Sequence, residues 1–401
     1  MCTQIKFTFL GDLACDEAMI KDFEAEKGKY DFNFLFQEMR AYFAESDYVL
    51  ANLETPISYD NKNLTWEKWR FCAPYDFALA AYKSGIDFLA TANNHCLDRG
   101  VTGISSTIKS LDEIGIEHTG VTDVKKKNSL IADIKGIRVG LLSYTYGTNA
   151  FEKGFYLKRS DYWRVNLFQR QELSGQLARY CFNNPEKIVS GLYNKIMKCI
   201  GSTNINRPVY ERRESKLFCR NRLRRTIKAL KKQKPDIIIM YMHAGGQYNE
   251  TASKDTKKLV SYLHKRGINI IAGTHEHVVH DGVFADYQNG KAATYSLGDF
   301  NHIKYETDVS GTLPEYSIAW NVYLSKREEK VFIEKMTYSI IKSFYDLTMD
   351  QKPYVIPAYD LYMKMTMEPE KEQLWSDMRK VAMRFSGKDI KEIGVKKEYD
   401  L

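Results

Sequence analysis

The chain has 401 residues, of which 44% are hydrophobic and 27% are charged, with a formal net charge of +8 at pH 7. A chain of this length can bury a large core and has room for one large domain with insertions or for two domains. The composition is globular, and the longest apolar runs, such as residues 237–242, are too short to span a bilayer. The sequence therefore predicts a globular protein without a membrane-spanning helix.

The beginning of the chain and its cysteines predict a cytoplasmic protein. Residues 1–10 go directly into a strand pattern, without the features of a signal peptide. The seven cysteines include no C-x-x-C pair, and this odd number fits reduced thiols better than a disulfide framework. We therefore expect a cytoplasmic location, free or at the periphery of the membrane.

One segment carries the positive charge. Residues 151–235 contain 21 lysines and arginines against six aspartates and glutamates, so the rest of the chain is net negative. Such a block indicates an anionic partner: a polymer, a phosphate-bearing substrate, a membrane surface or nucleic acid. The segment also holds an apolar stripe at helical spacing, which favours packing on the core, with a membrane-surface helix as the alternative. The stripe comprises Ile188, Val189, Leu192, Tyr193, Ile196, Met197 and Ile200.

Strands and helices alternate over the first 144 residues. The expected strands are Ile5–Leu10, Tyr48–Ala51, Ile86–Thr91 and Ile137–Tyr144. The expected helices cover residues 21–45, about Asp76–Ser84 and about Gly103–Ile114. This alternation argues for a mainly parallel sheet covered on both faces.

The alternation resumes after the basic segment. Further strands are expected at Asp236–Met242, from Ile268 to Gly273, and at Ala292–Leu297. Two runs joined by K-R-E-E-K predict a hairpin at the sheet edge, namely Ser317–Leu324 and Val331–Ser339. Helices are expected at about Lys254–Lys265 and at Glu370–Phe385.

Ligand-type side chains stand where the predicted strands end. They are Asp12, Glu54, Asn94 with His95, His243, and His275 with His277. Because open α/β sheets bind their ligands at the carboxyl edge of the strands, we expect these side chains to converge there. A mixture of imidazole, carboxylate and amide donors suits a borderline divalent metal, and it can provide both the bridging carboxylate and the terminal ligands of a two-metal centre.

Other roles stay open for these residues. His275 and His277 could be solvated loop histidines, Asn94 could cap the helix that follows it, and His95 could be a satisfied core histidine. Arg70 could bind an anionic substrate or simply be solvated. The pattern favours a metal hydrolase because so many strands end in the same kinds of side chain.

Several stretches resemble the CapA family of capsule and poly-γ-glutamate synthesis proteins, which is similar to the calcineurin-like metallophosphoesterases. The matching stretches are FLGDL, ANLETPIS, WRFCAPYDFALAAYKSGIDFLATANNHCLDRG, GISSTIKSLDEIGIEHTG, DIIIMYMHAGGQY, AGTHEHVV and YSLGDF. They run in the family's order from about Ile5 to Asn301, and NNHxLDxG followed by GxHxHV is the specific part. The resemblance implies metallophosphoesterase-like layered sheets, with a mainly parallel core and an antiparallel edge, flanked by helices. That domain would cover residues 1–345, with 151–235 as a basic helical insertion and 346–401 as a C-terminal helical extension.

The resemblance also implies a role for each matching residue of the centre. Asp12 would bind one metal, Glu54 would bridge the two metals, and His277 would return to the first. The second metal would be held by Asn94, His243 and His275. Two divalent ions, Mn, Fe or Zn, are therefore the expected cofactors.

The residues beside this ligand set include both a candidate acid and two departures from the family pattern. His95 would protonate the leaving group, with Asp98 as its partner. Metallophosphoesterases usually have a histidine ligand two residues after the first aspartate, but here that residue is Ala14. Gln247 stands where the family commonly has a glutamate.

Two functions follow from the resemblance. The first is a metal-dependent hydrolase that acts on an anionic phosphoester or γ-glutamyl polymer in capsule or poly-γ-glutamate biosynthesis. The alternative is a non-catalytic or weakly catalytic subunit of an envelope-polymer assembly, which the departures at Ala14 and Gln247 favour. Either would have an anionic substrate or polymer as partner and could work with a membrane-bound synthesis protein, whereas nucleic acid is not expected.

Overall fold

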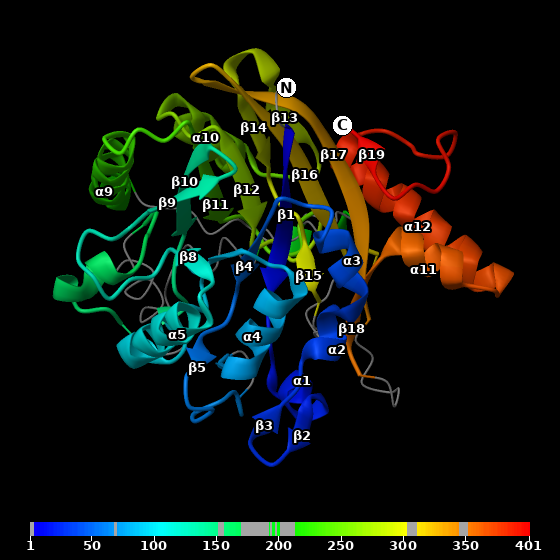
Figure 1. Ribbon diagram of the computed structural model, residues 1–401, viewed down its shortest axis with the longest axis horizontal. Coiled ribbons are helices and arrows are strands. Elements are labelled where there is room, and N and C mark those ends of the chain that lie inside the picture. Colours follow the sequence, from blue (N-terminus) through cyan, green and yellow to red (C-terminus); the bar gives the residue numbers. More distant parts are fainter. Residues whose placement is uncertain are drawn as a thin grey trace.

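The computed structural model describes residues 4–67, 70–150, 156–169, 192, 195–196, 199–200, 213–302, 311–344 and 352–401, with backbone only at 159, 213–217 and 283. Two β-sheets lie face to face in it, and helices cover their outer faces (Figure 1). α9 and α12 lie on opposite sides of the molecule (Figure 1). Their bounds are Arg213–Lys231 and Glu368–Ser386.

The first sheet combines parallel and antiparallel strands. Its order is β18 (Tyr354–Pro357), β17 (Lys330–Phe344), β16 (Tyr316–Arg327), β1 (Gln4–Leu13), β4 (Tyr48–Leu53), β7 (Phe88–Ala90) and β8 (Glu117–Thr119). Off this path, β15 (Asp299–Asn301) pairs with β1 and β19 (Tyr399–Asp400) pairs with β17. β1, β4, β7 and β8 are parallel to one another, whereas β16, β17 and β18 run antiparallel to their neighbours.

The second sheet has a parallel centre and antiparallel edges. Its order is β13 (Val283–Asp286), β14 (Lys291–Thr294), β12 (Ile270–Thr274), β11 (Ile237–His243), β10 (Ile137–Thr145) and β9 (Leu130–Ile134). β10, β11, β12 and β14 are parallel, and β9 and β13 close the two edges in the antiparallel sense. The prediction of a layered α/β fold with a mainly parallel core and an antiparallel edge is confirmed.

The main hydrophobic core lies between the two sheets. Alternate residues of β1, such as Phe7 and Phe9, meet alternate residues of β11, such as Ile239 and Tyr241, and all four side chains are buried. The hydroxyl group of Tyr241 donates to the carbonyl oxygens of Leu10 and Leu50, at 3.0 and 2.7 Å. These bonds satisfy a buried polar group and fix the spacing of the two sheets at the end where the strands deliver the candidate site.

Helices bury the outer face of each sheet. The first sheet is covered by α1 (Glu17–Asp22), α2 (Asn33–Phe36), α3 (Arg40–Phe43), α4 (Tyr75–Ser84) and α5 (Gly100–Ile114). The second sheet is covered by α9 and by α10 (Lys254–Lys265), whose apolar sides include Leu223, Leu230, Val260 and Leu263. The smaller elements are β2 (Glu24–Glu26), β3 (Lys29–Tyr30), η1 (Gln37–Met39), β5 (Ile57–Ser58), β6 (Ala73–Pro74), η2 (Arg159–Arg164) and η3 (Tyr287–Asn289).

Two sequence-based predictions about elements are wrong. The single helix expected at residues 21–45 is instead α1, the β2–β3 hairpin and three short helical segments. Gly28 takes a left-handed φ of 76°, and Asp31 accepts the Asn33 N–H group at 2.9 Å, so the chain turns twice within the expected helix. The β16–β17 hairpin is not at the sheet edge, because β16 pairs with β1 and β18 lies outside β17.

The C-terminal residues 352–401 pack against the first sheet. α11 (Ala358–Lys364) and α12 follow β18, and the apolar side of α12, including Leu374 and Phe385, joins the core between the sheets. β19 then pairs with β17. The expected boundary between residues 345 and 346 lies outside the described residues.

The predicted basic insertion, residues 151–235, is described only in part. Leu192, Ile196 and Ile200 are 57%, 50% and 68% exposed, so the expectation that their stripe packs on the core is wrong for these three residues. The other four members of the stripe lie outside the described residues. Among the helices that the structure describes, none combines the length and apolarity that crossing a membrane requires.

Gly11 lets β1 approach β15. A Cβ atom at this position would lie 1.7 Å from the carbonyl oxygen of Gly298, which also accepts the Asp12 N–H group at 3.2 Å. The contact is between two backbones, so rotation of a side chain cannot relieve it. A residue without a side chain is therefore required where Asp12 and Asp299 come side by side.

We expect Gly11→Ala to lower the free energy of unfolding by about 3 kcal/mol, because the added methyl group must push the two strands apart. Urea unfolding followed by circular dichroism would measure it. Gly147→Ala is the matched control, since its Cβ would meet only the Gln169 side chain, at 3.7 Å. Equal losses in the two variants would contradict the role given to Gly11.

Candidate metal centre

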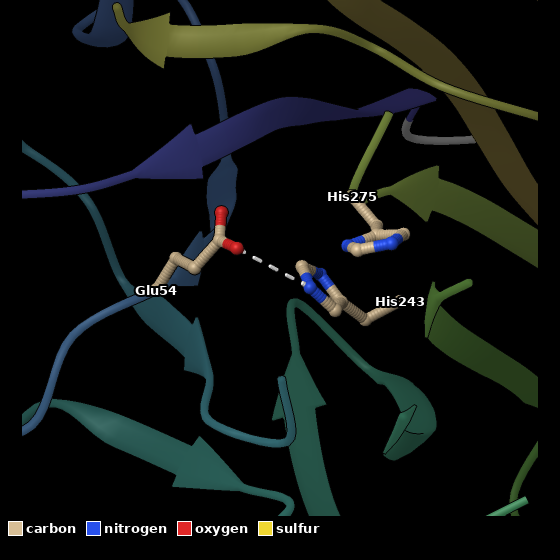
Figure 2. Close-up of side chains that lie close together, drawn as sticks. All are labelled: Glu54, His243 and His275. Atoms are coloured by element: carbon tan, nitrogen blue, oxygen red, sulfur yellow. Dashed lines mark ion pairs between the residues drawn. The ribbon is translucent and has the colours of Figure 1, made fainter. Parts of the chain in front are cut away.

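The ends of strands from both sheets bring the predicted ligands together. One group of potential ligand atoms, all within 4.8 Å of one another, comes from Asp12, Glu54, His277 and Asp299. A second such group comes from Glu54, His243 and His275. Glu54 belongs to both groups, and Figure 2 shows its carboxylate directed toward His243, with His275 beside that ring.

The register of the strands explains this convergence. Asp12 on β1 pairs with Asn52 on β4, and Glu54 follows two residues later. On the second sheet, His243 at the end of β11 pairs with Thr274 at the end of β12. Parallel strands in register deliver their last residues to the same edge, as the sequence predicted.

His275 and His277 have an unusual backbone. Their φ angles are 98° and 61°, in a region that residues with a side chain rarely adopt. The chain is held there by the N–H group of His275, which donates to Asp12 Oδ2 at 2.9 Å, and by the N–H group of Tyr248, which donates to the Glu276 carbonyl oxygen at 2.7 Å. Such strain costs about 1 to 3 kcal/mol per residue and is concentrated at functional sites.

His243 lies at the centre of the second group. Its Nε2 atom is 2.6 Å from Asn94 Oδ1 and 3.4 Å from Glu54 Oε1. Its Nδ1 atom is 2.9 Å from the Thr274 hydroxyl oxygen. Asn94 is therefore close enough to add an amide oxygen to this group, as the resemblance implied.

Sequence reasoning missed Asp299. It lies at the start of β15, opposite Asp12, and its two carboxylate oxygens lie 2.9 Å from His277 Nδ1 and 3.1 Å from His302 Nδ1. A signal was present, because the triplet Leu-Gly-Asp occurs at 10–12 and again at 297–299. The repeat of this triplet marks Asp299 as a candidate equivalent to Asp12.

The buried carboxylates and imidazoles of the centre favour neutral forms. Burial raises the pKa of Asp12 to about 8, and the nearby Glu54 adds to the rise. Burial also raises the pKa of Glu54, lowers that of His243 to about 3 and lowers that of His275. Burial therefore disfavours the ionised forms of Asp12 and Glu54 unless a positive charge lies beside them.

His277 and Asp299 are the exception. Burial favours the neutral form of His277, but the carboxylate of Asp299 outweighs this effect and raises the pKa of His277 to about 10. Burial opposes the charge on Asp299 as well, yet His277 holds the pKa of that carboxylate below its usual value. The two side chains form a buried ion pair that fixes both of them.

The donor atoms fit a bound cation. Glu54 is 1% exposed, and neither of its carboxylate oxygens has a hydrogen-bond partner among the described residues. The Nδ1 atom of His275 likewise lacks a partner there. Buried polar atoms are normally satisfied, so donors left open and directed at one point indicate a ligand such as a metal ion.

His95 and Asp98 form a buried pair next to these groups. Nδ1 of His95 is 2.7 Å from Asp98 Oδ2, which also accepts the Phe71 N–H group at 2.8 Å. The Phe71 ring lies against the imidazole, with centroids 4.3 Å apart. Asn93 accepts the His95 N–H group and donates to the carbonyl oxygen of Leu53, so the loop is tied to the strand that leads to the ligands.

The other residues singled out from the sequence lie around the centre. Arg70 is not in either ligand group; it lines a cleft of about 580 Å³ and contacts Glu67 at 3.1 Å and the Asp98 carbonyl oxygen at 3.4 Å. Gln247 Nε2 is 3.3 Å from His277 Nε2. Ala14 contributes only backbone groups, which bond the Asn301 side chain.

A family model described as "Bacterial capsule synthesis protein PGA_cap" matches residues 6–303. The chain belongs to this family. It is 24% identical to the capsule biosynthesis protein CapA of Bacillus anthracis over 74% of this chain and 59% of that protein. It is 23% identical to the PGA biosynthesis protein CapA of Bacillus subtilis strain 168, over 73% of this chain and 62% of the relative.

The PGA_cap match covers the whole candidate centre. The chain spans about three fifths of the length of the two relatives. Among solved structures, the calcineurin-like phosphoesterase YfkN of Bacillus subtilis aligns with 85% of this chain and 91% of its own, at 14% identity and a TM-score of 0.39.

We expect metal uptake at pH 7 to release protons and metal affinity to fall as the pH falls. Asp12, with a pKa of about 8, and His277, with a pKa of about 10, are mainly protonated at pH 7 without metal and must lose protons to become ligands. Calorimetric titration with Mn²⁺ in two buffers of different ionisation enthalpy would count the protons. Equal binding enthalpies in both buffers would contradict this expectation.

Proposed function

We propose that the chain is a metal-dependent hydrolase that acts on an anionic phosphoester or γ-glutamyl polymer during capsule or poly-γ-glutamate biosynthesis. Glu54 is the observation that carries the proposal. It is buried, shared by two ligand groups and without a hydrogen-bond partner among the described residues, as a carboxylate that bridges two cations requires. The names of the Bacillus relatives support the biosynthetic context.

The two groups would each hold one divalent ion, with Glu54 between them. The first ion would be bound by Asp12, His277 and Asp299, and the second by Asn94, His243 and His275. When bound, such a pair neutralises charge on an anionic substrate and activates water for attack. The walls formed by the two sheets keep bulk water out, since all of these side chains are buried or nearly so.

His95 would protonate the leaving group. Its ring is fixed by Asp98 at Nδ1 and by the Phe71 ring on one face, so Nε2 is the nitrogen that would give the proton. It is next to Asn94 in the sequence but belongs to neither ligand group. An acid placed in this way can give a proton to a departing oxygen or nitrogen without competing for a metal.

The alternative is a weakly catalytic or non-catalytic subunit of an envelope-polymer assembly. Gln247 favours this alternative, because residue 247 is commonly a glutamate in the family. Here its side-chain amide contacts His277 instead. Ala14 favours it less than the sequence suggested, because Asp299 supplies a further carboxylate to the group that lacks the usual histidine.

We expect His95→Ala to lower turnover by a factor of about 10² to 10⁴, which is the range for the loss of a general acid. The metal content of the variant should stay close to that of the wild type. Phosphoester and γ-glutamyl substrates with good leaving groups should be affected less, because they need less protonation. His118→Ala removes another histidine that pairs with an aspartate, 3.1 Å from Asp112, and serves as the control.

Two results would count against these roles. Unchanged turnover of every substrate in His95→Ala would exclude this residue as the acid. Wild-type protein that holds two metals per chain but hydrolyses none of the substrates would favour the assembly role instead. Metal content by mass spectrometry and turnover must therefore be measured on the same samples.

The partner in this proposal is an anionic polymer, bound by a basic face on α9 and α10. Residues 220–234 contain eight lysines and arginines and no acid, and residues 254–266 contain five with one aspartate. The buried side of α9 packs on the second sheet, which leaves Arg224, Arg225 and Lys228 exposed. Tyr262 joins the two helices, because Arg220 and Arg266 lie over its ring at 4.6 and 5.1 Å.

We expect Arg224→Glu with Arg225→Glu to weaken binding of poly-γ-glutamate at least tenfold at low salt, and we expect wild-type binding to fall steeply with ionic strength. Fluorescence anisotropy with labelled polymer would measure both effects. Lys27→Glu with Lys388→Glu changes the same charge elsewhere on the surface and is the control. If neither the polymer nor anionic vesicles bind at low salt, the face is only solvated; binding to vesicles alone would indicate a membrane surface instead.

A further inference from the structure

We infer that the two halves of the centre take different metals, a carboxylate-rich half for Mn²⁺ and an imidazole-rich half for Zn²⁺, with Asp299 as the residue that makes them different. The inference rests on the proposed two-metal function and adds the identity of each ion. It starts from the donor atoms that the fold brings together.

The two ligand groups differ in chemistry. The first has three carboxylates and one imidazole, from Asp12, Glu54, Asp299 and His277. The second has two imidazoles and the shared carboxylate of Glu54, with the amide oxygen of Asn94 2.6 Å from His243. Carboxylate oxygens suit hard ions such as Mn²⁺, whereas imidazole suits Zn²⁺.

Asp299 is fixed in place before any ion arrives. Asp299 pairs with Asp12 between β15 and β1, where Gly11 and Gly298 allow the two backbones to come into contact. Its two oxygens are held by His277 at 2.9 Å and by His302 at 3.1 Å. A carboxylate that is oriented in this way has the support that metal ligands usually receive from a neighbouring group.

The same carboxylate accounts for Ala14. The side chain at residue 14 is a methyl group and cannot bind metal, so a donor must come from elsewhere if the first ion is to have four protein ligands. Asp299 supplies it from another strand, as an oxygen in place of the nitrogen that a histidine would provide. The exchange moves the first half further from Zn²⁺ and toward a hard ion. His302 is then a positioning residue, which acts on the metal through Asp299.

Stepwise displacement in wild-type protein tests the inference. Zn²⁺ generally binds more tightly than Mn²⁺, so it will replace Mn²⁺ in both halves eventually, and the informative quantity is the order of release. Protein loaded with two Mn²⁺ per chain is titrated with Zn²⁺, and free Mn²⁺ is measured by electron paramagnetic resonance. We expect one Mn²⁺ to leave with the first equivalent of Zn²⁺, and the second only at concentrations at least about tenfold higher. Release of both ions in a single step would overturn the inference.

Variants then assign the halves. Asp299→Asn keeps the size of the side chain and should weaken the retained Mn²⁺ at least about tenfold, while the tight Zn²⁺ equivalent stays. His302→Ala should weaken the same ion by about 10- to 100-fold, and it decides the assignment if Asp299→Asn fails to fold. Asp389→Asn removes a surface carboxylate that pairs with Arg379 and is the control. Unchanged Mn²⁺ affinity in both Asp299→Asn and His302→Ala would remove Asp299 from the ligand set.

Hydrolysis assays on the same loaded samples separate this inference from the proposed function. Two-step displacement without turnover of any phosphoester or γ-glutamyl substrate would overturn the hydrolase and leave the unequal halves standing. Turnover combined with single-step displacement would support the hydrolase and overturn the inference that the two halves take different metals.

Discussion

The candidate centre depends on carboxyl groups that the fold buries between two sheets. Glu54 is enclosed, with no hydrogen-bond partner among the described residues, and Asp12 lies beside it. Carboxylates in such a place are costly unless a positive charge joins them. The bonds from Tyr241 to both neighbouring strands and from the His275 N–H group to Asp12 hold the sheets at the spacing that keeps these groups together.

Much of the fold could be predicted because its signals are local. The helix Lys254–Lys265 has the predicted bounds, since Ser253 caps it and its apolar positions recur at helical spacing. The ligands at strand ends converge because parallel strands share one edge, which is a general rule and needs no detail of packing. The prediction of one helix at residues 21–45 is wrong because the left-handed Gly28 and the turn at Asp31 interrupt an otherwise helical pattern of apolar residues.

What the sequence could not predict is pairing over long distances. Asp299 becomes part of the centre only because β15 pairs with β1. In this pairing Asp299 lies opposite Asp12, which is 287 positions earlier in the chain. The position of β16 beside β1, rather than at an edge, is likewise a matter of which strands meet. No local propensity encodes either pairing, so a residue whose role comes from such a contact looks like any aspartate at the end of a strand.

The division of ligands between the sheets has a further consequence. The carboxylates and the amide come from the first sheet and the loops that follow its strands, whereas His243, His275 and His277 all come from the second. Neither sheet could therefore bind a metal strongly alone, and any slide of one against the other changes the distances between oxygen and nitrogen donors. Mutations deep in the interface between the sheets can then alter metal occupancy without touching a ligand, and residues 130–294, which form the second sheet, are constrained together with the segments on either side that form the first.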